Sequence, residues 1–123
     1  MDYKLFAVRV FVTDWERAIR FYSRTLEMTI AYQSDEMGWA QMAPGEGQLA
    51  LERVDPSDEE GRALVGRFVG VSLQVPDLFT TYKVLTERGV EFVGPPEKAV
   101  ASGHTVASRS FWAYWLLAGR VSQ

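Results

Sequence analysis

The stretch Val8-Arg-Val-Phe-Val-Thr-Asp-Trp15 alternates apolar and other residues and then reaches an acid, as a half-buried strand leading into a helix does. Residues 71–78, Val-Ser-Leu-Gln-Val-Pro-Asp-Leu, repeat this pattern. The two acids, Asp14 and Asp77, are 63 positions apart, and the same offset relates the residues that follow them. The repeat predicts a duplicated module. A chance likeness between two alternating strands is the alternative.

Each half predicts the order strand, helix, strand, strand, strand. In the first half we expect strands over 5–12, 28–33, 39–43 and 48–54. Thr13 is the expected N-cap of the helix, with Glu16 closing a capping box. Residues at three- and four-residue steps form the expected buried stripe of this helix: Trp15, Ala18, Ile19, Tyr22 and Leu26.

In the second half we expect strands over 69–75, 91–93, 105–108 and 111–118, and a helix from Pro76-Asp77 to Gly89. The predicted fold class is α+β, with two βαβββ modules, about 5–54 and about 67–123, within one domain. The acidic linker between them, 55–66, is interpreted as a solvated connector or as a mobile loop over a pocket that favours cationic ligands.

Composition excludes several classes of protein. The 123 residues carry a net charge of −3 and no basic block, which argues against a nucleic-acid partner. The chain has no cysteine and one histidine, His104, so thiolate and multi-histidine metal sites are excluded. The longest apolar run, 111–119, is about half of the ~20 residues that a membrane span needs. Without a signal-peptide pattern at residues 1–4, we expect a cytoplasmic protein with no membrane association.

The doubled module resembles the vicinal oxygen chelate superfamily, which includes glyoxalase I, extradiol dioxygenases and bleomycin-resistance proteins. The resemblance implies that the two modules form a cupped mixed sheet with helices on its outer face. The matching residues include Asp14 ahead of Phe21-Tyr22, then Leu49-Ala-Leu-Glu52, and Val75-Pro-Asp77, over about residues 5–106. Two features depart from the family pattern. Leu26-Glu27 stands where a Leu-Gly pair is usual, and residues 108–115 lack the usual Asp-Pro-x-Gly-Asn turn.

The resemblance implies four positions for a divalent cation, two in each module. They are occupied here by Ala7, Glu52, Gly70 and Trp115. One carboxylate does not replace the water shell of a hard cation, so we expect neither a metal nor another cofactor. Glu52 is a weak candidate for a catalytic base; the alternative is an ion pair with Arg9. His104 is a further acid–base candidate, or a solvated loop residue.

Strand alternation places Arg9, Phe11, Ala50 and Glu52 on the cupped face, while Val8, Val10 and Val12 face the helix. Trp39 and Gln41 are expected to contribute from the third strand, although their side of the sheet is left open by the pattern. The expected ligand-binding residues combine aromatic and polar side chains: Arg9, Phe11, Trp39, Gln41, Glu52, Ser72, Gln74, Phe111 and Trp115. The aromatic residues could instead fill a core or a dimer interface.

The expected cleft has small residues at metal positions and is lined by aromatic residues. In this it resembles the metal-free, drug-binding branch of the superfamily. That resemblance implies a non-catalytic homodimer that sequesters an aromatic or cationic small molecule, such as an antibiotic. Two alternatives stay open. One is a glyoxalase- or dioxygenase-like enzyme with an atypical or absent metal site, and the other is an interaction module whose cleft has closed.

Overall fold

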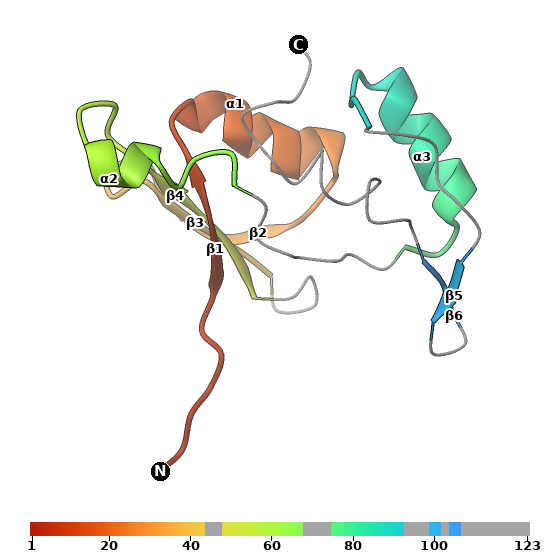
Figure 1. Cartoon of the computed structure of the whole chain (residues 1–123), viewed down its shortest axis with the longest axis horizontal. Helices are drawn as coiled ribbons and strands as arrows, with labels where there is room; N and C mark the ends of the chain where they lie inside the picture. The colour runs from red at the N-terminus through yellow and green to blue at the C-terminus, as the bar shows by residue number, and fades with distance from the viewer. Residues whose placement is uncertain (44–47, 68–74, 93–98, 102–103, 107–123) are drawn as a thin grey trace. The chain divides into compact units, whose positions relative to one another are not determined.

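A computed structural model describes residues 1–43, 48–67, 75–92, 99–101 and 104–106 (Figure 1). The chain forms two compact units, Met1–Arg67 and Phe68–Gln123. The elements of the first unit are β1 (Val8–Val12), α1 (Trp15–Arg20), the π-helical turn η1 (Phe21–Thr25), β2 (Ile30–Ser34), β3 (Trp39–Met42), β4 (Leu49–Arg53) and α2 (Glu59–Arg62). The elements described in the second unit are α3 (Leu78–Glu87), β5 (Ala99–Ala101) and β6 (His104–Val106).

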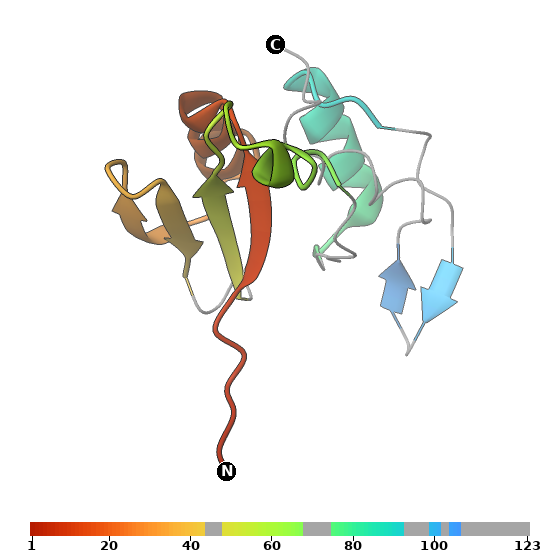
Figure 2. The same cartoon turned by 60° about the vertical axis from the view of Figure 1, so that its left-hand side comes forward.

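The first unit is a βαβββ module with a four-stranded mixed sheet in the order β1-β4-β3-β2. β1 pairs with β4 in parallel, and β3 is antiparallel to both β4 and β2. Figure 2 shows the arrows of β1 and β4 side by side and pointing the same way. The chain is therefore α+β, and the expected mixed sheet is confirmed for this module.

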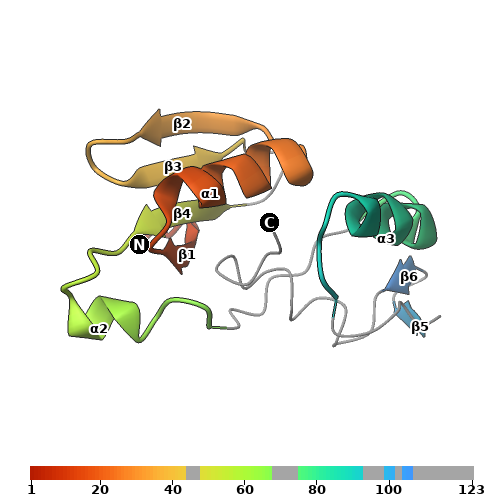
Figure 3. The same ribbon diagram turned by 90° about the horizontal axis from the view of Figure 1, so that it is seen from above.

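One face of this sheet packs beneath α1 and η1, as Figure 3 shows from above. Alternate strand residues and the inner side of the helix are almost fully buried there: Val10, Val12, Trp15, Ala18, Phe21, Tyr22, Ala40, Met42, Leu49 and Leu51. Two members of the expected stripe, Ile19 and Leu26, are only partly buried, whereas Phe21 is buried. The alternation in β1 is confirmed, because Val10 and Val12 are buried while Arg9 is exposed.

The N-cap of α1 is Asp14, and the prediction of Thr13 was wrong. Asp14 has an extended backbone, and its carboxylate accepts a hydrogen bond from the backbone N–H of Arg17 at 3.3 Å. A carboxylate at this place also interacts favourably with the positive end of the helix dipole. Asp77 does the same for α3, accepting from the N–H of Thr80 at 3.0 Å. The two capping pairs keep the 63-residue offset.

The observed strand boundaries differ from the predicted ones by a few residues. β1 begins at Val8 rather than at Leu5 because its partner β4 begins at Leu49, opposite Val8. A turn at residues 35–38 joins β2 to β3, and Gly38 takes a left-handed backbone there with φ of 68°. The expected linker contains one short helix, α2.

The second unit confirms α3 and its end, because Gly89 follows the C-cap Arg88 and has a φ of 89°. The rings of Tyr82 and Phe92 pack at 4.8 Å between centroids. Residues 91 and 92 are not in a strand, so that part of the predicted strand was wrong. The strand expected at 105–108 is β6 at His104–Val106, paired with β5, which was not predicted. The strands expected at 69–75, apart from Val75 at its end, and at 111–118 lie outside the described residues.

Within the described ranges, every helix is too short or too polar to span a lipid bilayer.

Candidate functional site

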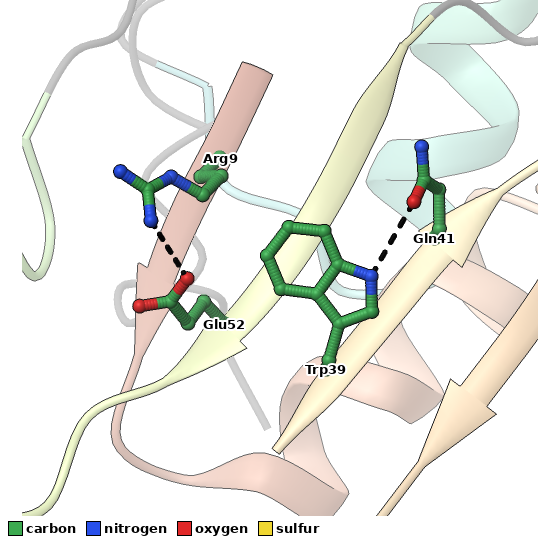
Figure 4. A network of polar contacts seen from close by, with 4 residues as sticks. All are labelled: Arg9, Trp39, Gln41 and Glu52. Carbon is green, nitrogen blue, oxygen red and sulfur yellow. Dashed lines mark hydrogen bonds and ion pairs between the residues drawn. The ribbon is translucent and has the colours of Figure 1, made fainter. Parts of the chain in front are cut away.

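The sheet of the first unit has a second face, turned away from α1, which we call the open face. Four of its polar side chains are Arg9 in β1, Trp39 and Gln41 in β3, and Glu52 in β4 (Figure 4). Tyr32 and Ser34 of β2 lie on the same face, opposite Gln41 and Trp39. The register explains why they meet: Trp39 lies opposite Glu52, and Gln41 lies opposite Ala50, which in turn pairs with Arg9. Residues paired across neighbouring strands project from the same face of a sheet.

An ion pair joins β1 to β4 on the open face. Nη1 of Arg9 donates to Oε1 of Glu52 at 3.0 Å, from a neighbouring strand. The Arg9 side chain is 52% exposed and that of Glu52 is 31% exposed. The guanidinium also lies over the ring of Phe11, 5.2 Å from its centroid, close enough for a cation–π interaction. The pairing of Glu52 with Arg9 is the second of the two interpretations that the sequence allowed.

The indole of Trp39 is held from two directions. Its Nε1–H donates to Oε1 of Gln41 at 3.4 Å, and its ring stacks on Phe6 with centroids 6.0 Å apart and planes at 12°. The amide of Gln41 also donates from Nε2 to the backbone oxygen of Phe6 at 2.9 Å. The open face therefore presents an aromatic platform, Phe6 and Trp39, beside the Arg9–Glu52 ion pair.

Phe6 was not predicted to belong to this site. Strand alternation puts Phe6 on the side opposite to Arg9, but alternation holds only within a strand. Residues before Val8 are outside β1, so the chain is free to turn the Phe6 ring onto Trp39. The ring is 69% exposed. The feature of the sequence that could have identified Phe6 as a site residue is its position as an aromatic residue just before β1.

The remaining expected site residues, Ser72, Gln74, Phe111 and Trp115, lie outside the described residues. His104 begins β6 in the second unit. The structure thus brings together five of the expected ligand-binding residues: Arg9, Phe11, Trp39, Gln41 and Glu52.

The residues at the four positions implied for a divalent cation do not fit such an ion. Ala7 offers no donor atom, and the carboxylate of Glu52 is paired with a guanidinium. Gly70 has no side chain, and the indole N–H of Trp115 is a hydrogen-bond donor that cannot coordinate a metal. In the part of the chain that the structure describes, no three His, Asp or Glu residues gather in a metal-binding group.

Comparison with known proteins agrees with the architecture. The model of the Glyoxalase/Bleomycin resistance protein/Dioxygenase superfamily matches residues 4–111, so the chain belongs to this superfamily. A member from Sphaerobacter thermophilus DSM 20745 has a solved structure with a TM-score of 0.62 and 32% identity, covering 80% of this chain and 81% of that one.

Two further proteins are similar. TnmS3, described as an antibiotic-binding protein from Streptomyces sp. CB03234, has a TM-score of 0.59 and 28% identity, with 78% of each chain covered. The uncharacterized protein YraH of Bacillus subtilis (strain 168) is 29% identical over 101 residues, covering 76% of this chain and 78% of YraH.

Proposed function

We propose that the protein binds and sequesters a small planar molecule on the open face without converting it. The observation that carries the proposal is the placement of an ion pair, Arg9–Glu52, directly beside the stacked rings of Phe6 and Trp39. Aromatic rings offer stacking area at low entropic cost, and a few polar groups fix the orientation of a ligand. The similarity to an antibiotic-binding protein supports antibiotics as the first compounds to test.

The test is a titration of purified protein with planar and cationic antibiotics, including bleomycin-type glycopeptides, followed by tryptophan fluorescence and calorimetry. We expect saturable quenching at roughly micromolar ligand. Trp39→Phe should remove most of the quenching and weaken binding by about tenfold, because stacking area on the open face is lost. Ligand recovered after incubation should be chemically unchanged by mass spectrometry.

Trp15→Phe is the matched control. Trp15 is buried on the opposite, helix-covered side of the sheet. Its loss should leave the dissociation constant unchanged. Absence of binding across the panel, or equal effects of the two substitutions in folded variants, would overturn the proposal. Conversion of a ligand by wild type but not by Glu52→Gln would instead favour the enzyme alternative.

We further propose that the protein acts as a homodimer. Large apolar side chains at the start of the chain and on β2 support a second copy as partner, since Leu5 is 67% and Tyr32 is 55% exposed. Sedimentation velocity across a concentration series tests this, and a monomer at all concentrations, with and without ligand, would contradict it.

A further inference from the structure

We propose that Arg9 makes the open face selective for planar aromatic ligands that carry an anionic oxygen group, a carboxylate or a phenolate. This inference rests on the proposed binding function and names the ligand class of the same site. It differs from the preference for a cationic ligand that one interpretation of the acidic linker, 55–66, predicted.

The first step concerns which polar groups of the site remain available to a ligand. The Trp39 indole N–H is bonded to Gln41, and the Gln41 amide is bonded to the backbone of Phe6. Both side chains therefore use hydrogen-bonding capacity to hold the aromatic platform. Of the four polar side chains in β1, β3 and β4, recognition of a ligand's polar group therefore falls to Arg9 and Glu52.

The second step concerns which of these two groups an incoming ligand meets. A guanidinium has five N–H donors in a planar fork, and Arg9 uses Nη1 for Glu52. The side chain of Arg9 is 52% exposed, against 31% for Glu52. The more accessible group is thus the cation, whose remaining N–H donors match the two oxygens of a carboxylate.

The third step concerns how the guanidinium is held. Glu52 contacts it from β4, and the Phe11 ring lies 5.2 Å from it within β1. These contacts restrain the Arg9 guanidinium before a ligand arrives, which lowers the conformational entropy lost on binding. Glu52 is therefore a positioning residue for Arg9.

The fourth step concerns local charge. The chain as a whole carries a net charge of −3. In β1, β3 and β4, however, Arg9 and Glu52 are the charged side chains on the open face, so their charges balance there. Because exposed charges more than about 10 Å away are largely screened at physiological salt, the pair outweighs the acidic surface elsewhere.

The experiment measures the binding of three planar probes of the same ring system by calorimetry at pH 7: acridine-9-carboxylate, acridine-9-carboxamide and 9-aminoacridine, which are anionic, neutral and cationic. The full-length wild type should bind the carboxylate about tenfold more tightly than 9-aminoacridine. Arg9→Gln should abolish this preference, and Arg9→Lys should restore part of it, since lysine keeps the charge but not the fork. Glu52→Gln should keep the preference.

Arg24→Gln is the control for a simple loss of positive charge, because Arg24 is an exposed residue of η1, outside the open face. It should leave the preference unchanged. Tighter binding of 9-aminoacridine, lost in Glu52→Gln, would overturn the inference by making Glu52 the recognition group. Equal binding of the three probes, reduced by Trp39→Phe, would overturn the inference but support the proposed binding function. Absence of binding by all three would count against both.

Discussion

Glu27 and Gly89 occupy the same position in the two halves, the residue after the helix C-cap, and both have a left-handed backbone, with φ of 58° and 89°. The first helix is one residue longer, since Glu27 and Gly89 are 62 positions apart and the N-caps, Asp14 and Asp77, are 63 apart. The extra residue is accommodated by the wider π-helical turn at Phe21–Thr25.

The left-handed conformation makes Glu27 a strained position. Glu27→Gly should be more stable than Glu27→Ala by about 1 kcal/mol, because only glycine avoids the clash of Cβ in this region. The alanine variant is the reference, since both substitutions remove the interactions of the glutamate side chain. Urea unfolding followed by circular dichroism measures the difference. Equal stabilities would show that the φ of this residue is not left-handed in solution.

The hydroxyl of Tyr22 is buried and has no hydrogen-bond partner within the described structure. Burial raises the pKa of this phenol far above its usual value. Tyr22→Phe removes the unpaired polar group and keeps the ring, so we expect the free energy of unfolding to rise by about 1 kcal/mol. Tyr22→Ala should instead lower it by roughly 3–5 kcal/mol, as truncation of a buried ring leaves a cavity.

Chemical denaturation of both Tyr22 variants measures these changes. Destabilisation by Tyr22→Phe would contradict the expectation and would mean that the hydroxyl has a partner.

Asp35 joins the β2–β3 turn to α1 through hydrogen bonds. Its carboxylate accepts from the Gln33 amide at 2.8 Å and from the Trp15 indole at 2.9 Å. These bonds, with a further contribution from the charge of Arg53, lower the pKa of Asp35. A lowered folded-state pKa stabilises the protein above the unfolded value of about 3.9, and this is lost as the pH falls through the folded pKa.

Asp35→Asn should therefore be less stable than wild type at pH 7 and should lose less stability below about pH 4. Thermal unfolding from pH 7 to pH 2.5 measures the two curves. Asp2→Asn, in the exposed N-terminal segment, is the control and should follow wild type. Parallel curves for Asp35→Asn and wild type would contradict the role of these hydrogen bonds.

Gly38 closes the same turn against β4. Its φ is 68°, and a Cβ at this position would lie 2.6 Å from Cβ of Arg53. The guanidinium of Arg53 is itself bonded to the backbone oxygens of Asp35 and Glu36, so the side chain has little room to move. Gly38→Ala should lower the free energy of unfolding by about 1–3 kcal/mol.

Gly66 provides the matched control for Gly38→Ala. It also has a positive φ, 77°, but nothing lies within 4 Å of a Cβ there. Gly66→Ala measures the backbone strain alone, so Gly38→Ala should be the more damaging of the two in urea unfolding. Equal costs would show that the contact with Arg53 relaxes.

Local sequence determined the elements that short-range rules govern. Alternation identified β1, β3 and β4 to within a few residues, and an acid after each repeated stretch marked the start of both helices. The choice of Thr13 over Asp14 was wrong because both residue types cap helices and only the backbone conformation distinguishes them. The family followed from the order and spacing of these elements.

Tertiary structure decided which residues share the open face. Period-two alternation within β3 cannot tell which side Trp39 takes, because that depends on its register opposite Glu52 in β4. Phe6 joins the site only because strand pairing begins at Val8. The residues before Val8 are outside the strand, and the Phe6 ring stacks on Trp39. Sequence thus specified the strands, since local pattern encodes periodicity. The site required the pairing of strands distant in the chain, which local pattern does not encode.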